Sequence, residues 1–469
     1  MNFASLQFAF FVLALLVAYR LFRNTEHQNT LLLVASYYFY ACWDPRFLIL
    51  ILLVTGASFW TGARIAASSD VTVRRRLMIA YATFSLAVLG IFKYLDFFIG
   101  SAQSGLTALG LESDPVFLKI VLPAGISFFT FESLSYVIEI HHRQLKGDTR
   151  LRHYALFIAF FPKLVAGPIE RPAVLIPQIE RLRKLSAEDF ARGVFLILLG
   201  IFKKIVIADG LTRTVGSVYG AAGTPSAVDI AIGTWAFALQ IYCDFSGYTD
   251  IARGVSKLFG IELSQNFRFP YFSSGPSEFW RRWHISLSSW LRDYLYIPLG
   301  GNRGGEVRTR VNLMITMLLG GLWHGAAWNF VLWGGYQGLL LILGRMMPTP
   351  RNVGHSPLRK VVTTLAFFQL VCYGWLLFRA QSFGQIVAFT ERLVTGPYNV
   401  APTVFNPSLA TVLAILVLGG YEFVAYRAGQ ATFYRRWQPA VRGGLYAAMI
   451  FITAMGLANQ RSAFIYFQF

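Results

Sequence analysis

Apolar runs long enough to cross, or nearly cross, a lipid bilayer recur along this 469-residue chain. A transmembrane helix needs about 20 mostly apolar residues, because the hydrocarbon core of a bilayer is about 30 Å thick. The apolar runs lie at residues 3–19, 29–43, 46–63, 77–97, 117–140, 193–211, 230–248, 361–378, 408–426 and 443–460. This pattern predicts an all-α polytopic membrane protein, with a single transmembrane domain over residues 1–469.

The charge of the chain first suggests a different class of protein. Its 42 Lys and Arg residues outnumber 23 Asp and Glu residues, which leaves a net charge of +19. Nucleic-acid binders, however, gather basic residues on a solvated face. Here only 14% of residues are charged and 55% are hydrophobic, and the basic residues lie in short loops between apolar runs. We therefore expect membrane lipid as a partner and no nucleic acid.

The basic loops also predict the orientation of the chain, because Lys and Arg favour the cytoplasmic side of a membrane. Loops rich in these residues lie at 74–76, 143–152, 171–192, 345–360 and 427–442. Loops poor in them alternate with these, at 100–118, where Glu112 and Asp114 lie, and at 212–229 and 391–407. The alternation predicts that both termini lie on the side of the membrane opposite the cytoplasm.

Two apolar stretches lie between basic loops on both sides, so neither is expected to be one complete crossing. The first, 153–169, contains helix-breaking Pro162 and Gly167 and is expected to be re-entrant or in the membrane plane. The second, 311–345, spans about 52 Å as a helix, which is less than two crossings. It predicts a hairpin whose turn lies within the depth of the membrane, near His324.

The stretch 278–299 is too charged to cross a membrane. Its apolar residues follow helical spacing opposite a charged face, which predicts an amphipathic helix at the cytoplasmic boundary. His284 and Ser288 are four residues apart and would share one side of that helix.

His324 is the strongest candidate for a catalytic residue. An ionisable side chain at membrane depth is costly and points to function by default. A neutral imidazole can accept a proton from an attacking hydroxyl group. Trp323 and Trp328 are expected to wall its pocket. The alternative is a histidine that only joins two helices by hydrogen bonds.

His284 is the second candidate, with the alternative that it only faces lipid headgroups beside Arg282. Asp244 and Asp250 end an apolar run, where they could pair with Arg253 or orient a histidine. The alternative for both carboxylates is a structural ion pair at the cytoplasmic boundary.

Glu139, His141 and His142 superficially suggest a metal site, but beside Arg143 we expect them to form a cation-rich helix end, and the cysteines show no metal-ligand spacing, so we expect no metal site. Glycine-rich phosphate loops, the His-Glu-x-x-His pattern and the Gly-x-Ser-x-Gly pattern of serine nucleophiles do not occur in the sequence.

These motifs resemble those of the membrane-bound O-acyltransferases, and within them the bacterial branch that O-acetylates exported polysaccharides such as alginate or cellulose. The resemblance covers nearly the whole chain. The matching stretches are LLLVASYYFYACW (31–43), LPAGISFFTFESLSYVIE (122–139), FFPKLVAGPIERP (160–172), QIYCDFSGYTDIARG (240–254), NFRFPYFSSGPSEFWRRWHISLSSWLRDYLYIPLGGNRGG (266–305), NLMITMLLGGLWHGAAWNFVLWGGYQG (312–338) and FIYFQF (464–469).

The resemblance implies that His324, in the WHGA motif, is catalytic, and that His284, in the RRWHISLS motif, is the second characteristic histidine. It also implies a ring of helices around a central funnel, with roughly 11–12 transmembrane segments plus re-entrant and interfacial helices.

The implied reaction moves an acetyl group from a cytoplasmic thioester, with acetyl-CoA as the expected donor and no permanently bound cofactor. Arg281, Arg282 and Arg303 would attract its phosphates. His324 would be the general base, while His284 would position the acyl group or assist proton transfer. A periplasmic, esterase-like acetyltransferase would be the partner protein, and an exported polysaccharide the final acceptor.

Three other functions stay open at this point. D-alanyl or another acyl group could be transferred to a cell-envelope polymer, as in the more distantly similar D-alanyl transferase of teichoic acids. A transporter or export conduit would also use intramembrane histidines, although the second half of the chain does not echo the first. The chain could also be a scaffold for a polysaccharide synthase. The sequence does not identify the polymer.

Overall fold

The computed structural model describes residues 3, 5–111, 117, 121–183, 185–346, 357–398, 400–429, 433, 437–457 and 464. Within these residues every regular element is a helix, which confirms the all-α prediction. Glu112 and Asp114, residues 465–469 of the last matching stretch, and parts of the basic loops 345–360 and 427–442 lie outside the described residues.

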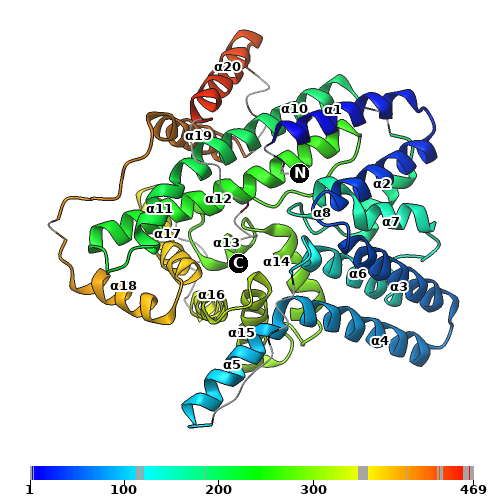
Figure 1. The fold of residues 1–469 in the computed structure, drawn as a ribbon, viewed down its shortest axis with the longest axis horizontal. Helices are drawn as coiled ribbons and strands as arrows, with labels where there is room; N and C mark the ends of the chain where they lie inside the picture. Colours follow the sequence, from blue (N-terminus) through cyan, green and yellow to red (C-terminus); the bar gives the residue numbers. More distant parts are fainter. Residues whose placement is uncertain are drawn as a thin grey trace. The chain divides into compact units, whose positions relative to one another are not determined.

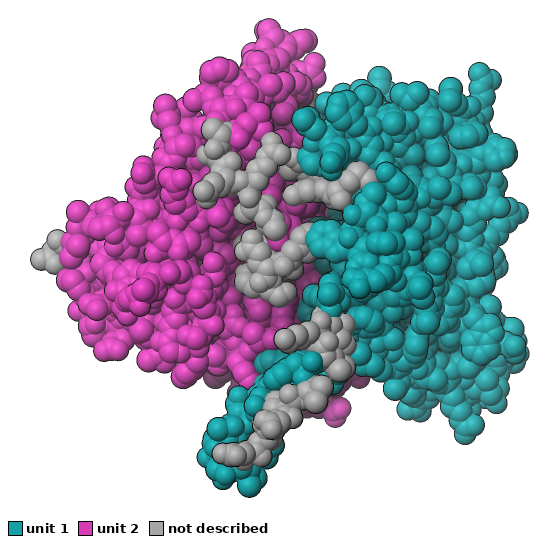
Figure 2. Space-filling model, viewed as in Figure 1, with its two compact units in different colours: residues 1–196, 252–264 teal, residues 197–251, 265–469 magenta. Residues whose placement is uncertain are grey.

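The chain divides into two compact units, shown in different colours in Figure 2. Unit 1 comprises residues 1–196 and 252–264, and unit 2 comprises residues 197–251 and 265–469. The prediction that residues 1–469 form a single transmembrane domain is not tested by this division, and it stays a prediction.

Unit 1 consists of helices, several of which begin at a side-chain cap. Asp70, for example, accepts hydrogen bonds from the first backbone N–H groups of the helix that follows it. The helices are α1 (Leu6–Leu21), α2 (Thr25–Ala41), α3 (Phe47–Ala67), α4 (Val71–Leu89), η1 (Gly90–Tyr94), α5 (Leu95–Ala108), α6 (Ile126–His141), α7 (Leu151–Ala159), α8 (Phe161–Leu164), α9 (Pro172–Glu180) and the first part of α10 (Ala187–Ile201).

The stretch 153–169 is broken, as the sequence predicts. Helix α7 has nine residues and spans about 14 Å, and it ends at Ala159 because the φ of −52° and ψ of 107° of the next residue, Phe160, are not helical. The freed backbone N–H of Phe161 donates to Ser36 Oγ over 3.1 Å. Non-helical backbone of this kind is tolerated at membrane depth only where protein buries it, and both Phe160 and Phe161 are fully buried.

A buried group of charges in unit 1 holds this broken segment to α6. Lys163, on α8, pairs with Glu132, on α6. The backbone N–H of Glu170 donates to Glu132 Oε1 over 3.1 Å, and the Glu170 carboxylate accepts hydrogen bonds from Ser264. All three charged side chains are buried, so each needs the others as partners.

Within the described residues, four helical segments are long and apolar enough to cross a membrane: Phe47–Ala67, Val71–Ala108, Pro357–Arg379 and Leu409–Ala428. Large apolar side chains such as Ile49, Leu416 and Phe423 are exposed on them. Apolar surface on this scale is unusual for a protein in water and expected for one in lipid. The chain is therefore a multi-pass membrane protein, while the number of roughly 11–12 crossings stays a prediction.

Unit 2 contains the two motifs with the candidate histidines, and Figure 1 shows its helices. They are the end of α10, η2 (Phe202–Ala208), η3 (Asp209–Leu211), α11 (Thr212–Tyr219), α12 (Ala227–Leu258, to residue 251), η4 (Pro270–Phe272), α13 (Pro276–Trp280), α14 (Ile285–Leu291), η5 (Arg292–Tyr296), α15 (Gly305–His324), α16 (Trp328–Met346), α17 (Pro357–Arg379), α18 (Phe383–Thr395), α19 (Leu409–Ala428) and α20 (Pro439–Gly456).

The predicted hairpin is formed by α15 and α16, which lie side by side (Figure 1). The chain turns directly after His324, the last residue of α15. The helices meet at backbone contact: a Cβ atom on Gly321 would lie 2.2 Å from the Phe330 carbonyl oxygen, and one on Gly334 would lie 2.3 Å from that of Met317. Glycine at both positions allows this approach.

The start of the hairpin differs from the sequence prediction. Helix α15 begins at Gly305, ahead of the apolar block 311–345, so its 20 residues alone span about 30 Å. The length of the block therefore no longer requires the turn to lie within the membrane. The depth of the turn stays a prediction.

The prediction of one amphipathic helix over 278–299 is wrong. Helix α13 ends at Trp280 and α14 begins at Ile285, because the chain bends at His284. Asn266 holds the bend: its carbonyl oxygen accepts from the Ile285 N–H over 2.9 Å, and its Oδ1 accepts from the Ser286 N–H over 3.1 Å. These bonds between distant residues replace the helical bonds that local spacing predicts.

Candidate active site

His284 and His324 lie together in unit 2 although 40 residues separate them in the sequence. The centroids of their rings are 6.3 Å apart. The exposed fraction is 0% for His284 and 4% for His324. His284 therefore does not face lipid headgroups from an interfacial helix, which was the alternative open to it on sequence grounds.

Aromatic side chains enclose the two histidines. Phe245, on α12, lies 4.7 Å from the His284 ring, measured between centroids. Trp333, on α16, and Phe378, on α17, lie 5.0 Å and 5.5 Å from the His324 ring. This enclosure excludes water from most of the surface of the imidazoles, which strengthens any electrostatic interaction made there.

The two tryptophans predicted to wall the pocket have different positions. Trp323 is buried, and its ring lies 5.8 Å from that of His284 and 5.1 Å from that of His324. Trp328 is 61% exposed, so its predicted role is wrong. The contacts of Gly321 and Gly334 set the register of the hairpin. In that register Trp333, and not Trp328, packs against the ring of His324.

His284 combines backbone strain with unused hydrogen-bonding groups. Its φ of 42° and ψ of 54° place it in the left-handed region, which a residue other than glycine adopts at a cost. Among the described residues, neither ring nitrogen has a hydrogen-bond partner. Buried polar groups without partners are rare, and both features are typical of sites that receive a ligand.

Ser288, predicted beside His284, supports the bend. Its Oγ donates to the Trp283 carbonyl oxygen over 3.1 Å, and its N–H donates to the His284 carbonyl oxygen over 2.9 Å. Both bonds anchor the backbone on the two sides of the strained residue. The Ser288 hydroxyl thus holds the backbone and does not face the ring of His284 as a helical neighbour would.

Asp244 and Asp250 pair with lysines that the sequence analysis missed. Lys204 Nζ lies 2.6 Å from Asp244 Oδ1 and 2.9 Å from Asp209 Oδ1, and Lys203 Nζ lies 2.9 Å from Asp250 Oδ2. These buried ion pairs favour the structural interpretation of the two carboxylates. The sequence did carry a signal, because two consecutive lysines in the apolar run 193–211 need anionic partners.

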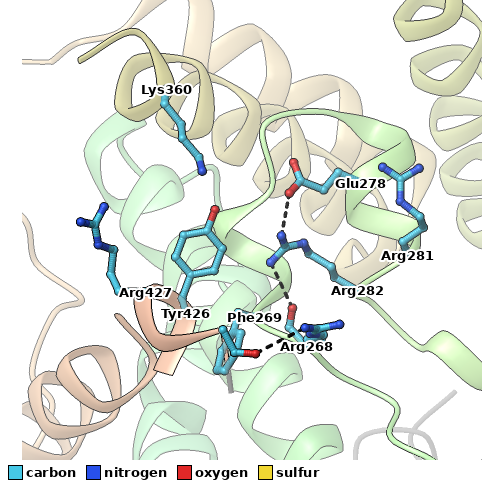
Figure 3. Close-up of a pocket in the computed structure, with 9 residues that line it drawn as sticks. Arg268, Phe269, Glu278, Arg281, Arg282, Lys360, Tyr426 and Arg427 are labelled. Carbon is cyan, nitrogen blue, oxygen red and sulfur yellow. Dashed lines mark hydrogen bonds and ion pairs between the residues drawn. The ribbon is translucent and has the colours of Figure 1, made fainter. Parts of the chain in front are cut away.

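A second feature of unit 2 is a basic pocket of about 710 Å³. Figure 3 shows its lining residues, which come from the segment before the bend, the start of α17 and the end of α19. Arg281 and Arg282 line it, as residues predicted to attract phosphates. Arg303 does not; it is exposed in the turn after η5. The lining residues are Arg268, Phe269, Glu278, Arg281, Arg282, Lys360, Tyr426, Arg427 and Gly429.

No group of three or more His, Cys, Asp or Glu side chains among the described residues has the arrangement of a metal site. The two imidazoles are the candidate bases that the enclosed site offers. A neutral imidazole can take a proton at one nitrogen and give one at the other, which suits acyl transfer to a hydroxyl group.

The chain is similar over most of its length to proteins with known names. Residues 139–383 match the model of the membrane-bound O-acyltransferase family, and this range contains both histidines. The protein named probable alginate O-acetylase AlgI of Pseudomonas aeruginosa is 42% identical over 390 residues, which are 81% of this chain and 72% of that protein. The peptidoglycan O-acetyltransferase of Helicobacter pylori is 32% identical, over 84% of this chain and 78% of its own length. The teichoic acid D-alanyltransferase of Bacillus subtilis is 27% identical, over 55% and 69%.

Proposed function

Because the chain belongs to the membrane-bound O-acyltransferase family, we propose that it moves an acetyl group from a cytoplasmic thioester across the bacterial inner membrane to O-acetylate an exported polysaccharide. The observation that carries this proposal is the pair of buried histidines, 6.3 Å apart between ring centroids, inside an aromatic enclosure. The alginate O-acetylases and the peptidoglycan O-acetyltransferase are more similar to this chain than the D-alanyltransferase, so acetyl is the favoured acyl group.

In the proposed reaction His324 is the general base. It accepts the proton of the acceptor hydroxyl as the oxygen attacks the thioester carbonyl carbon. The C–S bond then breaks, and the departing thiolate accepts from His324 the proton that the hydroxyl group gave up. Base catalysis of this kind contributes about 10²- to 10⁴-fold to a rate. The aromatic enclosure protects the thioester from hydrolysis by keeping water away.

His284 acts on the carbonyl group in this mechanism. A neutral imidazole donates one N–H, and the negative charge that develops on the carbonyl oxygen is best stabilised by a donor already held in place. The strained, hydrogen-bonded bend supplies that rigidity, and the ring nitrogens are not engaged by other described residues. The role is therefore positioning of the acyl group and stabilisation of the oxyanion.

The expected donor is acetyl-CoA, with Arg281 and Arg282 attracting its phosphates from the cytoplasmic side. Arg282 is two residues from His284, so their Cα atoms are at most about 7 Å apart. Arg282, which lines the basic pocket, and His284, at the bend, thus belong to one short segment. A donor bound by its phosphates at the pocket could therefore reach His284 with its thioester group.

The first acceptor in this proposal is a periplasmic, esterase-like acetyltransferase, which passes the acetyl group to the polysaccharide. The division of labour is suggested by the lack of a Gly-x-Ser-x-Gly pattern in this sequence. The distribution of basic loops supports a cytoplasmic donor side and periplasmic termini. Alginate- or cellulose-type polymers present suitable hydroxyl groups.

Replacement of His324 tests the function in cells. In a strain with His324→Ala, the polymer should be secreted at normal yield without its acetyl groups, as measured by the acetyl content of the purified polymer. His142→Ala, an exposed histidine in unit 1, is the matched control and should leave acetylation unchanged. Lost secretion would favour an export conduit or a scaffold, and unchanged acetylation would refute the catalytic role.

A further inference from the structure

Two aromatic side chains from neighbouring helices form a continuous apolar wall beside His324. Trp333, on α16, and Phe378, on α17, lie 5.0 Å and 5.5 Å from the His324 ring, measured between centroids. Their own rings are 5.3 Å apart and meet edge to face, and each side chain is 1% exposed. An acyl group that reacts beside His324 therefore has these two rings as neighbours.

A second layer of side chains lies behind this wall. The Phe330 ring meets that of Phe378 edge to face, with centroids 4.8 Å apart, and the Trp375 ring stacks on that of Trp333 with centroids 6.0 Å apart. Phe330 is itself held against the main chain, because a Cβ atom on Gly325 would lie 2.2 Å from its Cε2. Interiors packed in this way have little free volume, so the wall cannot move back to admit a larger group.

The main chain beside the wall is fixed by hydrogen bonds. Asn329 Nδ2 donates to the carbonyl oxygen of Phe378 over 3.0 Å and to that of Ala380 over 3.3 Å. Carbonyl groups at the end of a helix such as α17 have no partner within the helix, so these bonds satisfy them. Asn329 lies one turn before Trp333 on α16, so the same contact between α16 and α17 positions both residues of the wall.

We propose that Trp333 and Phe378 restrict the acyl group that reaches His324 to the two carbons of acetyl. The inference rests on the proposed function and specifies the length of acyl chain that the site accepts. A longer chain would need space that the packed rings occupy. A hydrophobic pocket discriminates about 10- to 200-fold for each additional methylene group, so two additional methylenes should reduce transfer at least about 100-fold.

The alternative is that the two rings serve only to pack the hairpin against α17. In that case their replacement would lower the amount of folded protein, and with it the transfer of every acyl group by the same factor. A steric limit predicts a different result, because removal of a ring should increase the transfer of a longer acyl group relative to acetyl.

The test measures this ratio in everted membrane vesicles, in which the cytoplasmic face of the full chain is outward. Acetyl-CoA and butyryl-CoA, with different isotopes in their acyl groups, are supplied together in equal amounts. The ratio of the labels transferred equals the ratio of the two kcat/KM values, so it does not depend on how much protein is folded. Wild type should prefer acetyl at least about 100-fold, and Phe378→Ala should lower that preference at least about tenfold. Phe378→Leu, a milder change in the core, should lower it by a smaller factor.

Phe367→Ala and Phe367→Leu are the matched controls. Phe367 is also buried on α17, but it lies 11 residues before Phe378, or about 16 Å along the helix, where its ring is 6.2 Å from that of Phe279. Both controls should keep the ratio of wild type.

Three results would overturn the proposal: wild type that transfers butyryl as readily as acetyl, Phe378 variants that keep the ratio of wild type, or Phe367 variants that shift it equally. Each of these leaves acyl transfer itself in place. Absence of both labels from acceptors in wild-type vesicles would instead overturn the proposed function, and this inference with it.

Discussion

A methyl group added at the contact between α15 and α16 provides a direct test of how the fold positions His324. In Gly321→Ala the new Cβ atom would lie 2.2 Å from the Phe330 carbonyl oxygen and 3.0 Å from Gly334 Cα. Ordinary contacts of this kind are about 3.4 Å or more, so the helices must separate by about 1 Å. Overpacking of a close contact costs about 1–3 kcal/mol.

The same separation should impair catalysis, because α16 carries Trp333 against the ring of His324. A misplacement of about 1 Å in an active site can lower a rate about 100-fold. Gly335→Ala is the matched control: its Cβ would lie 3.5 Å from Leu318 Cδ2, an ordinary contact. Because alanine is the better helix former by up to about 1 kcal/mol, the control should be as stable as wild type or slightly more stable.

The assay is thermal unfolding of the purified protein in detergent, together with the acetyl content of polymer from the same strains. Gly321→Ala should lower the apparent Tm and the acetyl content, and Gly335→Ala should lower neither. Equal stability and equal acetylation for the two variants would refute the idea that backbone contact at Gly321 sets the register of the hairpin.

Three further predictions follow from the buried residues of unit 2. Lys204→Met removes the lysine that pairs with the buried carboxylates of Asp209 and Asp244, so it should destabilise the protein by about 3–5 kcal/mol. The loss should appear as a lower apparent Tm, and a second substitution, Asp244→Asn, should recover part of it. Asparagine tolerates the left-handed backbone, so His284→Asn should keep a Tm close to that of wild type. Acetylation should fall about 100-fold or more, because the variant lacks the imidazole that stabilises the oxyanion. Normal acetylation would exclude a role for this imidazole. Trp333→Ala should cost about 3–5 kcal/mol and most of the acetylation, whereas Trp328→Ala should change both little, and the reverse ranking would contradict the hairpin register.

Sequence patterns predicted those structural features that are determined by residues close together in the chain. The glycine-rich turn after His324 and the helix-breaking residues of 153–169 are both legible in the sequence, and the structure has a hairpin and a broken segment at these places. Clustered apolar runs likewise predicted helices, because each run satisfies its own backbone hydrogen bonds.

Features that depend on distant residues could not be read in this way. The bend at His284 is imposed by Asn266, which lies 18 residues earlier, so helical spacing over 278–299 gave the wrong structure. Trp333 points inward because of the register set by Gly321 and Gly334, and no local pattern distinguishes it from Trp328. The ion pairs of Lys203 and Lys204, in η2, could have been predicted from the sequence, because buried cations require anionic partners.

The role of His324 in acyl transfer is tested most directly in everted membrane vesicles, whose cytoplasmic face is outward. Acetyl-CoA labelled in its acetyl group is added outside, and label on acceptors protected inside the vesicles is counted over time. Wild type and His142→Gln should accumulate label at the same rate, and His324→Gln should accumulate almost none while retaining the Tm of wild type. Accumulation by His324→Gln at the rate of wild type would contradict the account.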